Sequence, residues 1–168
     1  MVSLTAKIAL AIASELTTPL DIGDGSYRVN YGPTYVLSDG TGANQAKEIF
    51  TDTRTLAASA NESLDLSGGL TDVFGNSILF TKIKGLIIVA DAANTNDVIV
   101  GGAASNGFIS WVGGATHTAT VKPGGMMAFV APDANGYAVM AGTADLLKIA
   151  NSGAGTGVNY TIVVVGVA

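Results

Sequence analysis

Apolar and polar residues alternate along the first residues of the chain. From Val2 to Ile12 every second residue is a larger apolar one, and this period is typical of a half-buried strand. Leu4, Ile8 and Ile12 are also four residues apart, so a helix is the alternative. We favour the strand, and we expect Pro19 with the two threonines before it to end either element.

From Ser77 onward the pattern becomes that of a chain of short strands. Apolar runs rich in β-branched residues are separated by turn signals about every 8–12 residues, as expected of an antiparallel sandwich or barrel. The whole chain therefore predicts an all-β, antiparallel β-sandwich. We expect its strands at residues 48–56, 63–66, 78–90, 98–100, 108–112, 118–122, 126–131, 137–140, 146–150 and 159–168.

The clearest local signal lies between Thr118 and Asp133. Pro123-Gly124-Gly125 separates two β-prone segments, and proline followed by glycine suits the central positions of a tight turn. We expect a hairpin here. The apolar run from Met126 to Ala131 predicts a buried strand as its second half.

The N-terminal part is more polar and carries many turn residues. Residues 21–45 are rich in Gly, Asp, Ser and Asn, with short β-prone pieces at Tyr27–Tyr31 and Tyr35–Leu37. We interpret them as an extended arm or long loop that contains a hairpin. The expected division is an N-terminal strand and arm at residues 1–45 and a β-sandwich domain at residues 46–168.

Composition indicates a protein with covered surfaces. Apolar residues make up 48% of the 168 and charged residues 12%, against about 25% charged in ordinary soluble domains. We therefore expect part of the surface to be buried in a homo-oligomer, a homotrimer in our prediction. The net charge of −5 argues against a nucleic-acid partner, and no run approaches the roughly 20 apolar residues of a membrane span.

The sequence offers little material for catalysis or metal binding. His117 is the only histidine and there is no cysteine, so a nucleophilic triad and a zinc site both lack residues. Asp21-Ile22-Gly23-Asp24-Gly25 resembles part of a calcium loop but lacks the other ligands. Gly153–Gly157 leads into a strand, not a helix, so we interpret it as a hairpin loop. We predict no catalytic, cofactor-binding or metal-binding residues, and a protein that is not an enzyme.

Three further groups have a structural interpretation. Trp111 with Phe108 predicts a core or subunit-interface cluster, although a sugar-stacking surface is the alternative. Met126 and Met127 are expected to fill gaps in the core. Lys82 and Lys84 are two residues apart and are expected on the solvent side of their strand.

Several segments resemble small virion structural proteins of tailed bacteriophages. The likeness covers most of the chain from Asp39 onward and is one of pattern, with no catalytic motif. It lies in DGTGANQA, DTRTLAASANESLDL, GGLTDVFG, ANTNDVIVGGAASNGF, VKPGG and DLLKIANSGAGTGVNYTIVVVG.

The resemblance implies a sandwich of the jelly-roll kind that acts by assembly. We expect a head decoration or cement protein, located on the capsid surface of the virion. It would stabilise the capsid by binding between subunits of the major capsid protein. The alternative is a tail component or a receptor-binding component, such as a fibre or tube protein.

Overall fold

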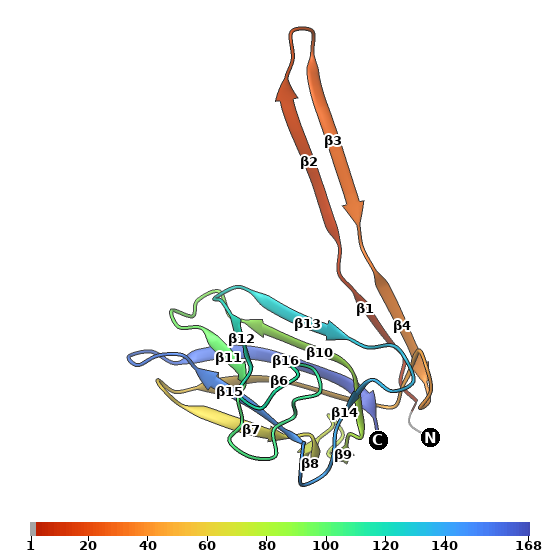
Figure 1. The fold of residues 1–168 in the computed structure, drawn as a ribbon, viewed down its shortest axis with the longest axis vertical. Helices are drawn as coiled ribbons and strands as arrows, with labels where there is room; N and C mark the ends of the chain where they lie inside the picture. Colours follow the sequence, from red (N-terminus) through yellow and green to blue (C-terminus); the bar gives the residue numbers. More distant parts are fainter. Residues whose placement is uncertain (1–2) are drawn as a thin grey trace.

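Eight of the strands form two four-stranded sheets that face each other (Figure 1). The computed structural model describes residues 3–168, which contain no helix. The first sheet has the order β13–β10–β16–β6 and the second the order β12–β11–β15–β7. Their bounds are β6 Glu48–Leu56, β7 Asn61–Asp65, β10 Lys82–Ala90, β11 Val98–Gly101, β12 Thr118–Val121, β13 Met126–Val130, β15 Leu146–Asn151 and β16 Val158–Val167.

The strand order is that of a jelly roll. Along the chain the eight strands pair first with last, second with seventh, third with sixth and fourth with fifth. All four pairings are antiparallel, so the sandwich is one long hairpin rolled up on itself. The predicted all-β, jelly-roll-like sandwich is confirmed.

Side-chain alternation explains how the two sheets pack. On β16, Tyr160, Ile162 and Val164 point inward and are almost fully buried. Phe108 and Trp111 add to this core from the segment between β11 and β12, and the Trp111 ring meets Phe129 edge-on, with ring centroids 5.1 Å apart. The core interpretation of Trp111 is therefore confirmed. Residues 108–112 form turns and not the expected strand.

The segment from Thr118 to Asp133 is strand, turn and strand, but it is not a hairpin. β12 pairs with β11 and β13 pairs with β10, so the Pro123–Gly125 turn crosses from one sheet to the other. β13 is an edge strand, and Met126 is 51% exposed. The prediction of a buried second strand is wrong, because an edge strand turns alternate residues toward solvent. Gly153–Gly157 likewise joins β15 to β16 in the other sheet.

Lys84 is buried, although the sequence predicts the solvent side. The ladder between β10 and β16 shifts register between Ile83 and Gly85, and the loop between β13 and β14 covers the Lys84 side chain at Asp133 and Gly136. Its amine donates to the carbonyl oxygen of Asp133, and burial lowers the pKa of Lys84. Lys82 stays partly exposed and donates to the carbonyl oxygen of Ala134 at 3.1 Å.

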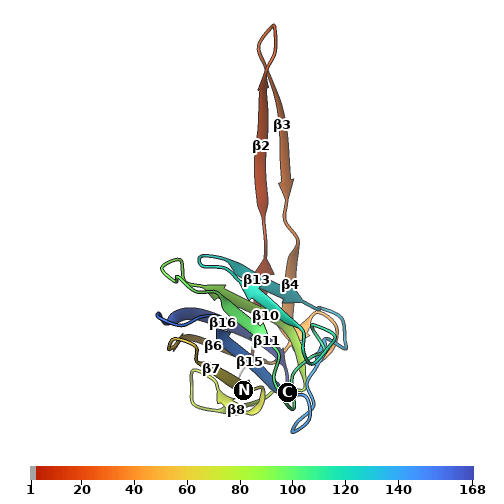
Figure 2. The same cartoon turned by 60° about the vertical axis from the view of Figure 1, so that its left-hand side comes forward.

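The N-terminal residues form one long two-stranded ribbon that leaves the sandwich (Figures 1 and 2). β1 (Ala6–Ala9) pairs with β4 (Thr34–Asp39), and farther out β2 (Ile12–Pro19) pairs with β3 (Asp24–Tyr31). The strand interpretation of the N-terminus is confirmed from Ala6, whereas Val2 lies outside the described residues. β2 ends at Pro19, as predicted, and the turn that closes the hairpin follows.

Four short strands complete the fold. β5 (Gln45–Ala46) pairs in parallel with β4, and β14 (Tyr137–Ala138) pairs with β10. β8 (Ser67–Thr71) and β9 (Ser77–Leu79) form a small hairpin below the second sheet (Figure 1). Residues 70–74 therefore belong to a strand and its turn.

Candidate assembly surface

The register of the ribbon sorts its side chains into two faces. Residues opposite each other in an antiparallel pair point to the same side, so the pairs Ile12–Tyr31 and Leu16–Tyr27 lie on one face. We call this face the apolar stripe. Its members from base to tip are Leu10, Ile12, Leu16, Tyr27, Val29, Tyr31 and Pro33, interrupted only by Ser14, Thr18 and Gly25.

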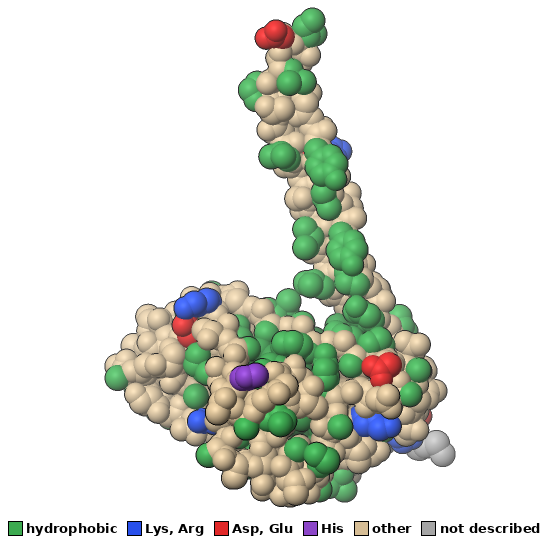
Figure 3. Space-filling view, viewed as in Figure 1, with side chains coloured by type: hydrophobic (Ala, Val, Ile, Leu, Met, Phe, Trp, Pro, Cys, Tyr) green, Lys and Arg blue, Asp and Glu red, His purple; other side chains and the backbone are tan. Residues whose placement is uncertain are grey.

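The apolar stripe is open to solvent over most of its length. The exposed fractions are 56% for Ile12, 73% for Leu16, 68% for Tyr27 and 67% for Tyr31. Figure 3 shows hydrophobic side chains following one another along the projecting ribbon. A run of large exposed apolar side chains of this length is unusual on a protein that works alone, and it marks an interaction surface.

The opposite face of the ribbon is polar. Glu15 and Arg28 face each other across β2 and β3, with Arg28 Nε 3.0 Å from Glu15 Oε1. Thr17, Ser26 and Asn30 occupy the same side. An exposed ion pair of this kind contributes little stability, so its value here is to identify the face that stays in water.

The base of the ribbon shows what the apolar stripe packs against. Ile8 lies over Gly85 of β10 so closely that a Cβ at Gly85 would be 2.6 Å from Ile8 Cδ1. Leu37 opposes Ala6 and is fully buried in a small cluster with Ala46 and Val165. The base of the ribbon, inward of the stripe, is therefore covered by the outer face of the first sheet, whereas Leu10, Ile12, Leu16, Tyr27 and Tyr31 of the stripe are exposed.

An apolar groove opens where the ribbon leaves the sandwich. It has a volume of about 190 Å³. One wall is the ribbon and the other is the outer face of the first sheet; the lining residues are Ile8, Ala9, Leu10, Pro33, Tyr35, Ile87, Met126, Ala128 and Val130. None of these side chains is charged.

The edge strand beside this groove lacks the usual protection. β13 reads MMAFV, with no charged residue and no proline. Natural proteins keep exposed edges from pairing with such residues, so an apolar edge strand next to an apolar groove indicates a surface that another chain covers.

A second apolar feature lies at the turn between β8 and β9. Val73 is 75% exposed and Phe74 76%. Asp72 fixes this turn by accepting hydrogen bonds from the backbone N–H groups of Phe74 and Asn76, at 2.9 and 2.8 Å, and from Asn76 Nδ2 at 3.0 Å. These bonds favour the ionised carboxylate and lower the pKa of Asp72.

The turn carboxylates predict a loss of stability in acid. The pKa of Asp133 is also lowered, because Asp133 accepts from the N–H groups of Asn135 and Gly136. Below the ordinary carboxyl pKa of about 4 the unfolded chain therefore binds more protons than the folded chain, and stability falls with pH. We expect the double variant Asp72→Asn, Asp133→Asn to show a shallower fall in urea midpoint between about pH 5 and pH 2.5. An equal fall in variant and parent would contradict this assignment.

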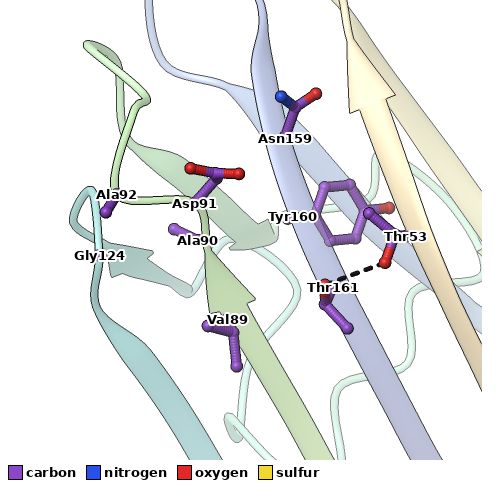
Figure 4. A pocket seen from close by; sticks show the side chains of 9 residues that line it. All are labelled: Thr53, Val89, Ala90, Asp91, Ala92, Gly124, Asn159, Tyr160 and Thr161. Carbon is purple, nitrogen blue, oxygen red and sulfur yellow. Dashed lines mark hydrogen bonds between the residues drawn. The ribbon is translucent and has the colours of Figure 1, made fainter.

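A shallow pocket lies at the far end of the outer face of the first sheet (Figure 4). It measures about 310 Å³. Thr53 and Thr161 share a hydrogen bond of 3.1 Å, and the Asp91 carboxylate accepts from the backbone N–H of Ala93. The Asn159 side-chain oxygen accepts from Thr55 at 2.6 Å. The polar groups of the pocket form hydrogen bonds with neighbouring side chains and with the backbone. No nucleophile with an adjacent base is among the residues that line it.

One polar cluster bridges the two sheets at their open edge. Glu62 of β7 accepts from Arg54 of β6, with Nε 2.8 Å away, and its other oxygen accepts from the Tyr160 hydroxyl at 2.8 Å. Arg54 also donates to Asp52 at 2.7 Å. These hydrogen bonds raise the pKa of Arg54, and burial with the Glu62 bond raises that of Tyr160. The side chains of Arg54, Glu62 and Tyr160 all have hydrogen-bond partners within the cluster. The Arg54–Glu62 bond connects β6 to β7.

The other residues considered for chemistry are dispersed. His117 is exposed, with Nδ1 3.1 Å from the carbonyl oxygen of Val112, and Asp21 and Asp24 lie at the tip of the ribbon. Residues 3–168 contain no group of three or more His, Cys, Asp or Glu side chains placed to hold a metal ion. Sequence reasoning missed the apolar stripe, whose only signal is the matching alternation of residues 12–16 and 27–31.

No helix suited to crossing a membrane occurs among residues 3–168. Comparison of the chain with models of protein families, with curated proteins and with solved structures found no match.

Proposed function

We propose that this protein is a structural subunit of a bacteriophage virion that decorates the head and stabilises the capsid. The observation that carries the proposal is the apolar stripe, an exposed contact surface held away from the body. A protein that acts by contact area needs such a surface and no reactive constellation. The resemblance of the sequence to small phage virion proteins supplies the setting.

The jelly-roll body suits this role without proving it. Jelly rolls occur in viral capsid proteins and also in unrelated lectins and enzymes, so the fold alone does not assign a function. The surface chemistry is more informative. With only 12% charged residues and a net charge of −5, the body is compatible with close packing in an assembly and unfavourable for binding nucleic acid.

The proposal is tested with particles that lack the protein. Heads and tails are prepared from phage in which the gene is deleted, and each is mixed with increasing amounts of purified chain and then sedimented. We expect saturable binding to heads, none to tails, and heads that resist heating better once saturated. Binding to tails alone would replace the head role by the tail or receptor-binding alternative.

A further inference from the structure

We propose that the apolar stripe of one copy packs in the apolar groove of a second copy, so that copies join arm to groove in a closed ring. The inference rests on the proposed function and names the partner of the arm as the protein itself. A head-to-tail contact of this kind closes when the rotation between copies is a simple fraction of a turn.

The base of the ribbon already contains this contact within one chain. Ile8, on the same face of the ribbon as the stripe, lies on Gly85, and Leu37 is buried against Val165. Farther out the stripe continues with the same kind of side chains but has left the sheet. The outer face of the first sheet thus packs against the base of this apolar ribbon. Another part of that face, around Ile87 and Ala128, lines the open groove.

The arm cannot fill the groove beside it. The ribbon forms one wall of that groove and then leads away from the body through two ladders, β1–β4 and β2–β3, which the Leu10 N–H to Pro33 carbonyl bond connects (Figures 1 and 2). Folding back would break the paired hydrogen bonds of both strands. The groove and the unguarded edge of β13 are therefore available only to another molecule.

The two surfaces have the same chemistry. Neither the stripe nor the groove carries a charged side chain, so two chains of net charge −5 meet where repulsion is weakest. The two tyrosines expose roughly 250 Å² and the stripe as a whole roughly 500 Å². Each arm-to-groove contact then buries roughly 500 Å² per partner, or roughly 1,000 Å² in total, which is at the lower limit for a specific interface. Each copy in a ring takes part in two such contacts.

Engineered cysteines test the contact directly, because the chain has none of its own. One preparation carries Leu16→Cys in the stripe and a second carries Ala128→Cys in the groove. Mixed and treated with a short bis-maleimide, they should yield a cross-linked pair of unlike chains. Thr17→Cys is the matched control, since it lies at the same height on the polar face. We expect at least about tenfold less cross-linking with Thr17→Cys than with Leu16→Cys, because the cysteine at position 17 points away from the groove.

Sedimentation of the purified wild-type chain completes the test. We expect an oligomer at micromolar concentration, and Leu16→Ser with Tyr27→Ser should shift it to monomer, while Glu15→Gln with Arg28→Gln should not. A wild-type monomer at tens of micromolar, or equal cross-linking from Leu16→Cys and Thr17→Cys, would overturn the inference. A monomer that still saturates heads would contradict the contact between copies and support the proposed function. A ring that binds no particle would support the contact and contradict the proposed function.

Discussion

A chain whose arm has been shortened is expected to keep its jelly roll and lose its ability to assemble. Residues 11–32 can be replaced by Asn-Gly together with Pro33→Thr, because positions 10 and 33 already face each other and Leu10 N–H donates to the position 33 carbonyl at 3.3 Å. Threonine supplies the backbone N–H that closes the turn and that proline lacks. Asn-Gly favours the tight turn that a two-residue hairpin requires. The variant retains Ile8 and Leu37, which cover the outer sheet face, and lacks the exposed part of the stripe.

The size of this effect follows from the side chains removed. Two exposed tyrosines, Ile12 and Leu16 are the anchors of the stripe, and a well-packed anchor contributes about 2 kcal/mol or more to an interface. Losing several should weaken association by more than about a hundredfold. Occupancy on heads should fall with it, because separated copies lose the advantage of binding at linked sites.

Two measurements check the shortened chain. Its urea midpoint should match that of the parent, because the arm beyond Leu10 makes no contact with the buried core clusters. Its sedimentation and its occupancy on heads should be those of a monomer. Unchanged occupancy would place the contact surface on the jelly roll itself, whereas a large loss of stability would show that the arm is part of the folding unit.

Glu62→Ala is expected to be among the most destabilising single substitutions that leave the apolar core intact. The change removes the acceptor of the Tyr160 hydroxyl, and the Tyr160 side chain is 1% exposed. It also leaves Arg54 with Asp52 as its remaining partner. An unsatisfied buried hydroxyl costs about 1–3 kcal/mol, and the lost ion pair adds to it, so we expect a total of about 3 kcal/mol.

Glu62→Gln and Tyr160→Phe separate the two parts of this effect. Glutamine keeps an oxygen for the hydroxyl and loses the charge facing Arg54, while phenylalanine removes the hydroxyl and its need for a partner. Both should cost less than Glu62→Ala in urea unfolding. Equal stability of Glu62→Ala and the parent would show that water satisfies Tyr160 and that the cluster does not hold β6 to β7.

Local alternation predicted the strands well where one face is buried. β6 lies at the predicted residues 48–56, and β16 begins one residue before the predicted start, because both alternate clearly between core and outside. The sheet to which a strand belongs could not be predicted. Pro123–Gly125 suits a tight turn, but the pairing of β12 with β11 and of β13 with β10 depends on contacts distant in sequence.

The sequence predicted that an arm exists, but it did not predict which two strands of the arm pair. Asp24–Tyr31 pairs with Ile12–Pro19, across a turn closed by the Leu20 N–H to Gly23 carbonyl bond of 3.0 Å. The predicted end of the strand at Thr17–Pro19 is confirmed, because β2 ends at Pro19, where the missing N–H of proline is not needed. The exposure of Lys84 was mispredicted for a different reason: residues 133–136, distant in sequence, cover its side chain.

The same register decides where the arm can be cut. The expected boundary between residues 45 and 46 falls within β5, and a cut there would remove Leu37 from the cluster that covers Val165. Deleting residues 1–45 would therefore expose apolar surface on the jelly roll, which the cut at residues 11–32 avoids. The division into 1–45 and 46–168 stays a prediction, for which the shortened chain is the sharper test.

Electron cryomicroscopy of the intact virion tests the central claim most directly. We predict density for the jelly roll on the outer surface of the head, arranged in closed rings, with each arm lying in the groove between the arm base and β13 of the neighbouring copy. Density for the chain only in the tail, or arms that extend from the head without touching any neighbour, would contradict the account.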